Sequence, residues 1–158
     1  MAAEDLSLIR KRLVHKDISL ADAIRMFREE ARQDLTDIRL RWLDYELNGY
    51  PMVSGLINEA PFDVPEYRRV AGQYFARTAS GVWADVSDTK IEEIAGFLPV
   101  PIGVIEDIVA NPLNEMVDVQ LGELIANTPV AVRLHRTQLV KVDESVRNTL
   151  INLMDELA

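Results

Sequence analysis

Apolar residues recur at helical spacing over the first third of the chain. In "EDLSLIRKRLV" they fall three or four residues apart, and "DISLADAIRMFREEAR" repeats this spacing behind Ser19, whose hydroxyl can cap a helix that begins at Leu20. Between Asp34 and Leu47 there are two apolar stripes, which predict a helix covered on more than one side. The first stripe contains Leu35, Ile38, Trp42 and Tyr45, and the second contains Leu40, Leu43 and Leu47.

This third helix is expected to stop within the segment "LDYELNGYP". Gly49 follows Asn48 and can adopt the left-handed conformation that caps the end of a helix. Pro51 cannot continue the helix. Residues 1–48 are therefore expected to be helical, and residues 52–65, which contain Gly55, Pro61 and Pro65, are expected to form a loop.

From Tyr67 the pattern changes to one typical of strands. "YRRVAGQYFART" and "GVWADVS" flank "TASG", which predicts a hairpin near residues 67–86 with Gly72 as a candidate bulge. "NEMVDVQL" and "VAVRLHR" alternate apolar and polar residues and predict two more strands. "DTKIEEIAGFLPV" and "PIGVIEDIVAN" predict short helices, the first ending near Gly96 and the second beginning at Pro101. "GELIANTP" is typical of one or two helical turns that end at Pro129.

The chain ends in the pattern of a long amphipathic helix over residues 137–157, which Thr137 is expected to cap. The order of elements predicts the α+β class: N-terminal helices, a small antiparallel sheet, short helices and the C-terminal helix. We expect one domain over residues 1–158, with mixed strands and short helices in 66–135. The apolar positions of the last helix are Leu139, Val142, Val146, Leu150, Leu153 and Leu157.

The net charge of the chain and its distribution indicate which kind of binding partner to expect. The 158-residue chain has a formal net charge of −9, which disfavours binding to a nucleic-acid backbone. Residues 1–45 carry balanced charges, whereas residues 88–127 hold eight acids and one base, Lys90. This acidic stretch is either a solvated face or a docking surface for a basic partner. Nucleic-acid binding would have to use the basic residues of the first helices, which are Arg10, Lys11, Arg12, Arg25, Arg28 and Arg32.

The composition also indicates the cellular compartment in which the protein is expected. The chain has no cysteine, which excludes disulfides and thiolate chemistry. The N-terminus lacks the apolar core of a signal peptide, and no apolar run approaches the ~18 residues of a membrane span. We therefore expect a cytoplasmic protein that is not inserted in a membrane.

Motifs that carry chemistry are missing from the sequence. There is no phosphate-binding glycine pattern and no serine nucleophile elbow. Neither His15 nor His135 is spaced to pair with a nucleophile or a second metal ligand. Neighbouring carboxylates such as Glu106 and Asp107 point about 100° apart on a helix, so they do not converge by themselves. The sequence predicts no catalytic residue, metal ligand or cofactor, and leaves open a site assembled from distant segments.

Aromatic and arginine residues gather around the predicted helix stop and hairpin. Such residues either pack in the core or form a recognition surface. Alternation turns one of Arg68 and Arg69 inward, where it needs an acidic partner, because an unpaired buried charge is very costly. The candidate partners are Asp44, Glu46 and Glu66, and the aromatic and arginine set comprises Tyr45, Tyr50, Tyr67, Arg68, Arg69, Tyr74 and Trp83.

Four segments together resemble the AbiTii family: "RWLDYELNGYP", "VPEYRRVAGQY", "GVW" and "LVKVDESVRNTLINLMDEL". The resemblance implies a bacterial protein of an abortive-infection, phage-defence system, alone or as the N-terminal module of a longer chain. It implies no catalytic residues. The matching positions are Trp42, Leu47, Asn48, Gly49, Tyr50, Pro65, Glu66, Tyr67, Arg68, Val146, Arg147 and Asn148.

The leading functional hypothesis is a non-enzymatic module that binds a protein partner or a second copy of itself. The alternative is a toxin-like effector that arrests host growth through a site assembled only in the fold. Arg147 or Asn148 is expected to pack near the helix stop. The candidate interaction or junction residues are Trp42, Tyr45, Tyr50, Tyr67, Arg68, Arg69, Trp83, Arg147 and Asn148, and the candidate oligomer helix presents Val146, Leu150, Leu153 and Leu157.

Overall fold

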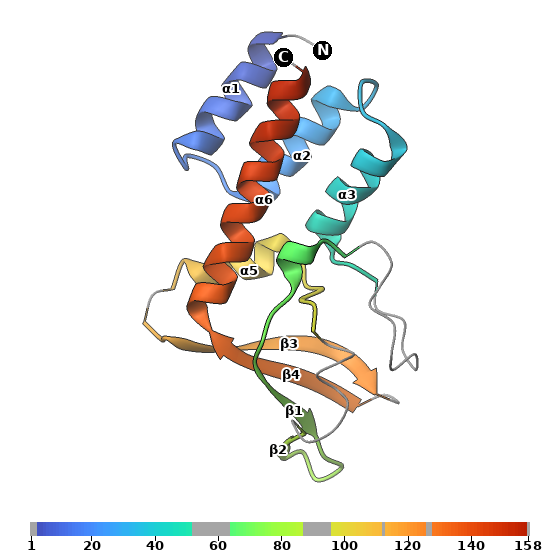
Figure 1. The fold of residues 1–158 in the computed structure, drawn as a ribbon, viewed down its shortest axis with the longest axis vertical. Coiled ribbons are helices and arrows are strands. Elements are labelled where there is room, and N and C mark those ends of the chain that lie inside the picture. The colour runs from blue at the N-terminus through green and yellow to red at the C-terminus, as the bar shows by residue number, and fades with distance from the viewer. Residues whose placement is uncertain (1–2, 52–63, 87–95, 112, 126–127, 158) are drawn as a thin grey trace.

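A group of helices lies beside a four-stranded antiparallel sheet in the computed structural model, which describes residues 3–51, 64–86, 96–111, 113–125 and 128–157 (Figure 1). This is the predicted α+β arrangement. In the described part of the chain, no helix is both long enough and apolar enough to span a bilayer. The elements are α1 (Ala3–Val14), α2 (Leu20–Ala31), α3 (Asp37–Asn48), the 3₁₀ helix η1 (Glu66–Arg68), β1 (Gln73–Arg77), β2 (Trp83–Asp85), α5 (Ile102–Val109), β3 (Met116–Ile125), β4 (Thr128–His135) and α6 (Arg136–Leu157).

The N-terminal helices form where the sequence predicted them, but one expectation about their burial is wrong. Ser19 caps α2, its hydroxyl accepting the Asp22 N–H at 3.0 Å. α3 is capped by Thr36. Two covered faces were predicted for the α3 region, and in the first stripe Leu35 is buried and Trp42 packs against the core, but the expectation is wrong at Ile38, which is 77% exposed. The reason is that α3 lies at the side of the helical group, where one of its faces meets solvent (Figure 1).

The sheet has the strand order β2-β1-β4-β3, with every neighbouring pair antiparallel. Tyr74 of β1 lies opposite Val132 of β4, which in turn lies opposite Val119 of β3. All three side chains are buried and belong to one hydrophobic cluster with residues of the helices, such as Phe27. The sheet therefore packs one face against the helices, as antiparallel sheets commonly do.

The long C-terminal helix joins the two halves of the molecule. α6 begins at the residue directly after β4 and runs from the sheet along the helical group, so its end lies near the start of α1 (Figure 1). Its predicted cap is wrong, because the helix already begins at Arg136. The ring nitrogen Nδ1 of His135 accepts the Thr137 N–H at 3.2 Å and serves that role instead.

Two further expectations differ from the structure. "GELI" was expected to be helical, but β3 continues through Ile125, with register shifts after Gln120 and Glu123. Gly122 has a φ of +83°, which lets the strand bulge and keep pairing with β4. Glu66–Arg68 forms η1, so the hairpin strands are shorter than residues 67–86. The predicted helix before Gly96 and most of the predicted loop after Pro51 lie outside the described residues.

Gly72 marks a close approach between chain segments, and no register shift occurs in the β1 pairings that follow it. A Cβ atom at this position would lie 2.6 Å from the Arg133 carbonyl oxygen and 2.7 Å from Val132 Cγ2. Beside it, the side-chain amide of Gln138 both accepts the Ala71 N–H and donates to the Ala71 carbonyl. Only glycine fits between these groups.

We expect Gly72→Ala to lower the free energy of unfolding by about 1–3 kcal/mol, because the added methyl must displace backbone and a packed valine. Urea unfolding followed by circular dichroism measures this. Gly103→Ala is the matched control, since its Cβ would meet only Ala21 at 3.8 Å and alanine favours the helix. Equal effects of the two substitutions would contradict the close approach.

Candidate functional site

A buried ion pair joins α3 to η1. The side chains of Glu46 and Arg68 are both 0% exposed, and the Nη2 atom of Arg68 donates to Glu46 Oε1. Arg68 Nη1 donates to the carbonyls of Leu98 at 2.9 Å and Val100 at 2.5 Å. The prediction that one arginine turns inward onto an acid is confirmed. Arg69 stays exposed and pairs with Glu66 at 2.8 Å.

Two tyrosine hydroxyls also donate hydrogen bonds to Glu46. Tyr50 donates to Oε2 at 2.5 Å and Tyr67 donates to the same oxygen at 2.6 Å. Trp42 Nε1 donates to the Tyr67 hydroxyl at 2.9 Å. Burial raises the pKa of both tyrosines above the ordinary value, and the negative charge of Glu46 raises it further. The hydroxyls therefore stay protonated and act as donors, which makes them unsuitable as general bases.

The stop after α3 puts these groups together. Gly49 has a φ of +96°, a conformation that L side chains rarely adopt, and its N–H closes the helix on the Tyr45 carbonyl. A Cβ at Gly49 would lie 3.1 Å from the Pro99 carbonyl oxygen. The next residue, Tyr50, donates its N–H to that oxygen at 2.8 Å. The chain reversal thus places the Tyr50 ring beneath Glu46 and fastens α3 to the segment after Gly96.

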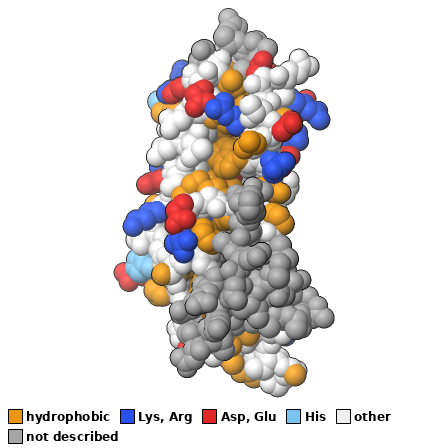
Figure 2. All heavy atoms as spheres, turned by 45° about the vertical axis from the view of Figure 1, so that its right-hand side comes forward, with side chains coloured by type: hydrophobic (Ala, Val, Ile, Leu, Met, Phe, Trp, Pro, Cys, Tyr) orange, Lys and Arg blue, Asp and Glu red, His pale blue; other side chains and the backbone are white. Residues whose placement is uncertain are grey.

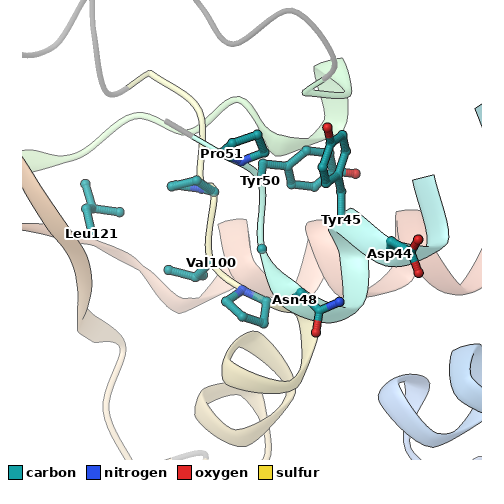
Figure 3. A pocket seen from close by; sticks show the side chains of 10 residues that line it. Asp44, Tyr45, Asn48, Tyr50, Pro51, Val100 and Leu121 are labelled. Atoms are coloured by element: carbon teal, nitrogen blue, oxygen red, sulfur yellow. The ribbon is translucent and has the colours of Figure 1, made fainter. Parts of the chain in front are cut away.

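A groove of about 610 Å³ opens beside this network (Figure 3). The rings of Tyr45 and Tyr50 lie 5.3 Å apart between centroids, tilted by 46°, and Leu121 of β3 lies on the opposite side. Asp44 is at the rim, where it pairs with Arg28 at 2.6 Å. The described lining residues are Asp44, Tyr45, Asn48, Gly49, Tyr50, Pro51, Pro99, Val100, Pro101 and Leu121.

Residues 6–158 match the family model AbiTii. The chain belongs to the AbiTii family. Its membership indicates a role in abortive-infection defence against phage. Searches of curated proteins and of solved structures found no match. The residues that carry the AbiTii resemblance include Trp42, Tyr50, Tyr67 and Arg68, so the family pattern falls on the buried network.

The other candidate residues of this AbiTii chain lie elsewhere. Trp83 is in β2, 39% exposed, opposite Arg77. Arg69 covers the ring of Phe97, with its Cζ 4.6 Å from the ring centroid. Asn148 is exposed on α6. The structure therefore brings together only the part of the predicted set that surrounds the helix stop.

Arg147 connects the two ends of the chain at a different place from the one expected. Its Nη1 donates to the Leu13 carbonyl at the end of α1 at 3.0 Å. Its Nη2 lies 3.6 Å from Asp143 one turn earlier on α6. Arg147 thus holds α1 against α6, whereas Glu46 and its partners hold α3 against η1.

The candidate oligomer helix faces the chain's own core. Val146 and Leu150 are 0% exposed and Leu153 is 7% exposed. Leu157 is partly buried against the same cluster. These four side chains offer little surface to a second copy. The surface of α6 that remains accessible includes one side of a groove of about 380 Å³ between α3 and α6. This groove is lined by Ile38, Arg39, Trp42, Thr149, Asn152, Leu153 and Glu156.

Sequence reasoning named Glu46 only as one of three possible partners, although a signal was present. Glu46 follows Leu43 by three positions and so shares the buried face of α3. An acid on such a face signals a buried partner. The carbonyls of Leu98 and Val100 carry no such signal, because any residue supplies a backbone oxygen.

Two half-buried carboxylates form a second polar cluster between α5 and α6. Glu106 accepts the N–H groups of Leu20 at 2.7 Å and Ala21 at 3.1 Å, which caps α2 from outside the helix. Burial raises the pKa of Glu106, and burial likewise raises that of Asp143, although Arg147 acts in the opposite direction. Glu106 joins α5 to the start of α2, and Asp143 pairs with Arg147 within α6. No group of His, Asp and Glu in the described ranges could hold a metal ion.

We expect Glu46→Gln to lower the free energy of unfolding by about 3–5 kcal/mol, because it leaves the buried Arg68 charge unpaired. Glu66→Gln is the matched control, since it removes the same charge from an exposed pair with Arg69 and should cost roughly 0–1 kcal/mol. Urea unfolding of both variants makes the comparison. A small effect at Glu46 would mean that the ion pair is not needed to hold η1.

Asp143→Asn should change how stability depends on pH. Because the pKa of Asp143 is raised in the folded state, the folded chain binds this proton more tightly than the unfolded chain. Its contribution to the free energy of unfolding therefore falls as the pH rises above the ordinary value. Between about pH 4 and pH 7 the wild type should lose stability relative to Asp143→Asn. Asn148→Ala, which removes no titrating group, should run parallel to the wild type. A difference of opposite sign would show that Arg147 outweighs burial.

Proposed function

We propose that the chain is a non-enzymatic protein-interaction module of an abortive-infection system. One observation carries the proposal: beside the groove, Glu46 and the hydroxyls of Tyr50 and Tyr67 are bonded to each other. Glu46 is engaged by Tyr50, Tyr67 and Arg68 together. The groove is instead lined by the half-buried Tyr45, part of the buried Tyr50 ring and prolines, with Asn48 and Asp44 at its border.

Such a surface suits binding of a protein segment. Tyrosine combines large contact area with a polar tip and little conformational freedom, which is why it is common at interaction sites. The ring of Tyr50 is held from behind by Glu46 and by the Arg68 guanidinium, whose Cζ lies 5.0 Å from the ring centroid. A partner would therefore meet a preformed site, which reduces the entropy lost on binding.

A second copy of the chain is one possible occupant of this groove. Binding there would give self-association without the helix residues Val146, Leu150 and Leu153, which are already in the core. Apolar side chains also gather in a strip on the helical half of the molecule, with charged side chains on either side (Figure 2). The groove is preferred to this strip because two buried donors and an ion pair fix its walls.

The toxin-like alternative is supported by the raised pKa values of Glu106 and Asp143. It is disfavoured because Glu106 is committed to the start of α2. Growth of the host after induction of the chain, with and without phage, separates this alternative from an interaction role. Arrest that disappears in Glu106→Gln, with the fold intact, would favour the toxin.

Nucleic-acid binding through the first helices is disfavoured by ion pairing. Arg10 pairs with Asp155, Arg25 with Asp22, and Arg28 with Asp44. These acids cancel half of the candidate basic set and would repel a phosphate backbone.

We expect Asn48→Arg to abolish partner binding and phage protection without unfolding the chain. Asn48 is exposed at the end of α3 and lines the groove, so a longer charged side chain obstructs the groove and leaves the core intact. The measurement is the native mass of the tagged chain isolated gently from its host, together with plaque counts. Gln33→Arg is the control, because it makes the same kind of change at an exposed position between α2 and α3.

A native mass above one chain that falls to one chain in Asn48→Arg supports the proposal. A wild-type mass of one chain, or a folded Asn48→Arg variant that protects normally, would overturn the role of the groove.

A further inference from the structure

β3 is an outer strand of the sheet, at the opposite edge from the hairpin strand β2. It pairs with β4 on one side, and alternate residues of such a strand point their backbone N–H and C=O groups away from the sheet. Pairing is regular from Met116 to Gln120 and shifts after that residue, where Gly122 bulges. Met116–Gln120 is therefore a straight stretch of open edge among the described strands.

This stretch has few of the features that usually protect an edge, because its one charged residue, Asp118, is paired with Arg133. Natural edge strands carry lysine, proline or a bulge, each of which prevents another strand from adding. The sequence from Met116 to Gln120 is "MVDVQ", with no lysine and no proline. The bulge protects only the part of β3 beyond Gln120.

A groove with a mixed polar and apolar lining lies beside the open edge. It has a volume of about 400 Å³ and lies between the end of α5 and the start of β3. Met116 is 50% exposed, and the nearby Leu113 is 83% exposed. The groove provides a place for side chains of an added strand, in addition to the backbone bonds that its edge offers. Its described lining comprises Asp107, Ile108, Asn111, Asn114, Met116, Val117 and Asp118.

The negative charge around β3 favours a positively charged segment as the added strand. From Val104 to Ile125 the sequence holds five acids and no lysine, arginine or histidine. Asp118 is neutralised by Arg133 at 2.8 Å. Asp107 and Glu115 are exposed and have no ion-pair partner in the part of the chain that the structure describes. Like charges disfavour pairing of β3 with β3 of a second copy and favour a basic partner.

We propose that the edge Met116–Gln120 binds an extended basic segment of another protein, which adds to the sheet as a fifth strand. Backbone hydrogen bonds along β3 hold the segment, as in other cases of strand addition. Alternate apolar side chains enter the groove beside Met116, and lysine or arginine side chains approach Asp107 and Glu115. This surface differs from the groove lined by Tyr45 and Tyr50, so the inference goes beyond the proposed function.

The test is a titration of the ¹⁵N-labelled full chain with the peptide Ac-(Lys-Val)₄-NH₂. Amide shifts should concentrate on Met116–Gln120, and hydrogen exchange should slow at alternate amides there. Ac-(Glu-Val)₄-NH₂ should bind at least about tenfold more weakly, because its charges are repelled. A Lys-Val peptide with alternate amides N-methylated should not bind, because it cannot pair with the edge.

The double variant Asp107→Lys with Glu115→Lys should weaken binding of the Lys-Val peptide by about tenfold or more. Its matched control is Glu30→Lys with Asp34→Lys, which reverses two exposed acids near the end of α2 and should bind as the wild type does. Both variants change exposed positions, and their amide spectra confirm the fold before titration.

Three outcomes would overturn the proposal. Shift changes away from β3 would relocate the site. Equal binding of the N-methylated peptide would show attraction of charge without strand addition. A dimer that forms without peptide and protects the β3 amides would make a second copy the occupant. A dimer through β3 would keep a native mass of two chains in Asn48→Arg, whereas self-association through the groove beside Tyr45 and Tyr50 would fall to one chain. Failure here and failure of the proposed function are therefore distinguishable.

Discussion

The ion pair between Glu46 and Arg68 is the constraint on which the arrangement of the molecule depends. Removing two charges from water costs several kcal/mol per ion, and this cost is offset only where the polar atoms of both ions find partners. Here the carboxylate accepts from two tyrosine hydroxyls as well as from the guanidinium, and the guanidinium also reaches two backbone carbonyls. These bonds can all form only when α3, η1 and the segment at Leu98–Val100 are correctly placed. We infer that the pair specifies one arrangement more than it adds stability.

The same network explains the character of the neighbouring surface. Because the polar ends of Tyr50 and Tyr67 point inward to Glu46, part of the Tyr50 ring and the adjoining prolines form the wall of the groove. The polar groups behind this wall are thus bonded to each other. Several residues of the AbiTii pattern, including Tyr50, Tyr67 and Arg68, therefore serve to hold the fold together.

The sequence predicted those parts of the fold that depend on local patterns. The α2 cap at Ser19, the stop at Gly49 and the hairpin around "TASG" follow from residue types at short range. The inward arginine was predicted from the cost of burying a charge. "GELI" was misread because its helical spacing is local, while its pairing with β4 is set by neighbours in space.

The groove could not be predicted at all, for a related reason. Its two sides come from α3 and from Pro99–Pro101, and the bond that joins them is accepted by a backbone carbonyl. Backbone atoms are the same at every position, so no residue type marks the place. The burial of Leu150 was equally hidden, because an amphipathic helix has the same pattern whether a second chain or its own core covers it.

The direct passage from β4 into α6 has a mechanical consequence. With no loop between His135 and Arg136, the strand and the helix cannot swivel freely about each other. α6 has 22 residues and so is a stiff rod about 33 Å long. A tilt of the sheet by a few degrees would be amplified along this rod into a displacement at its far end, beside the start of α1. The orientation of the sheet is thus mechanically coupled to the position of the far end of α6.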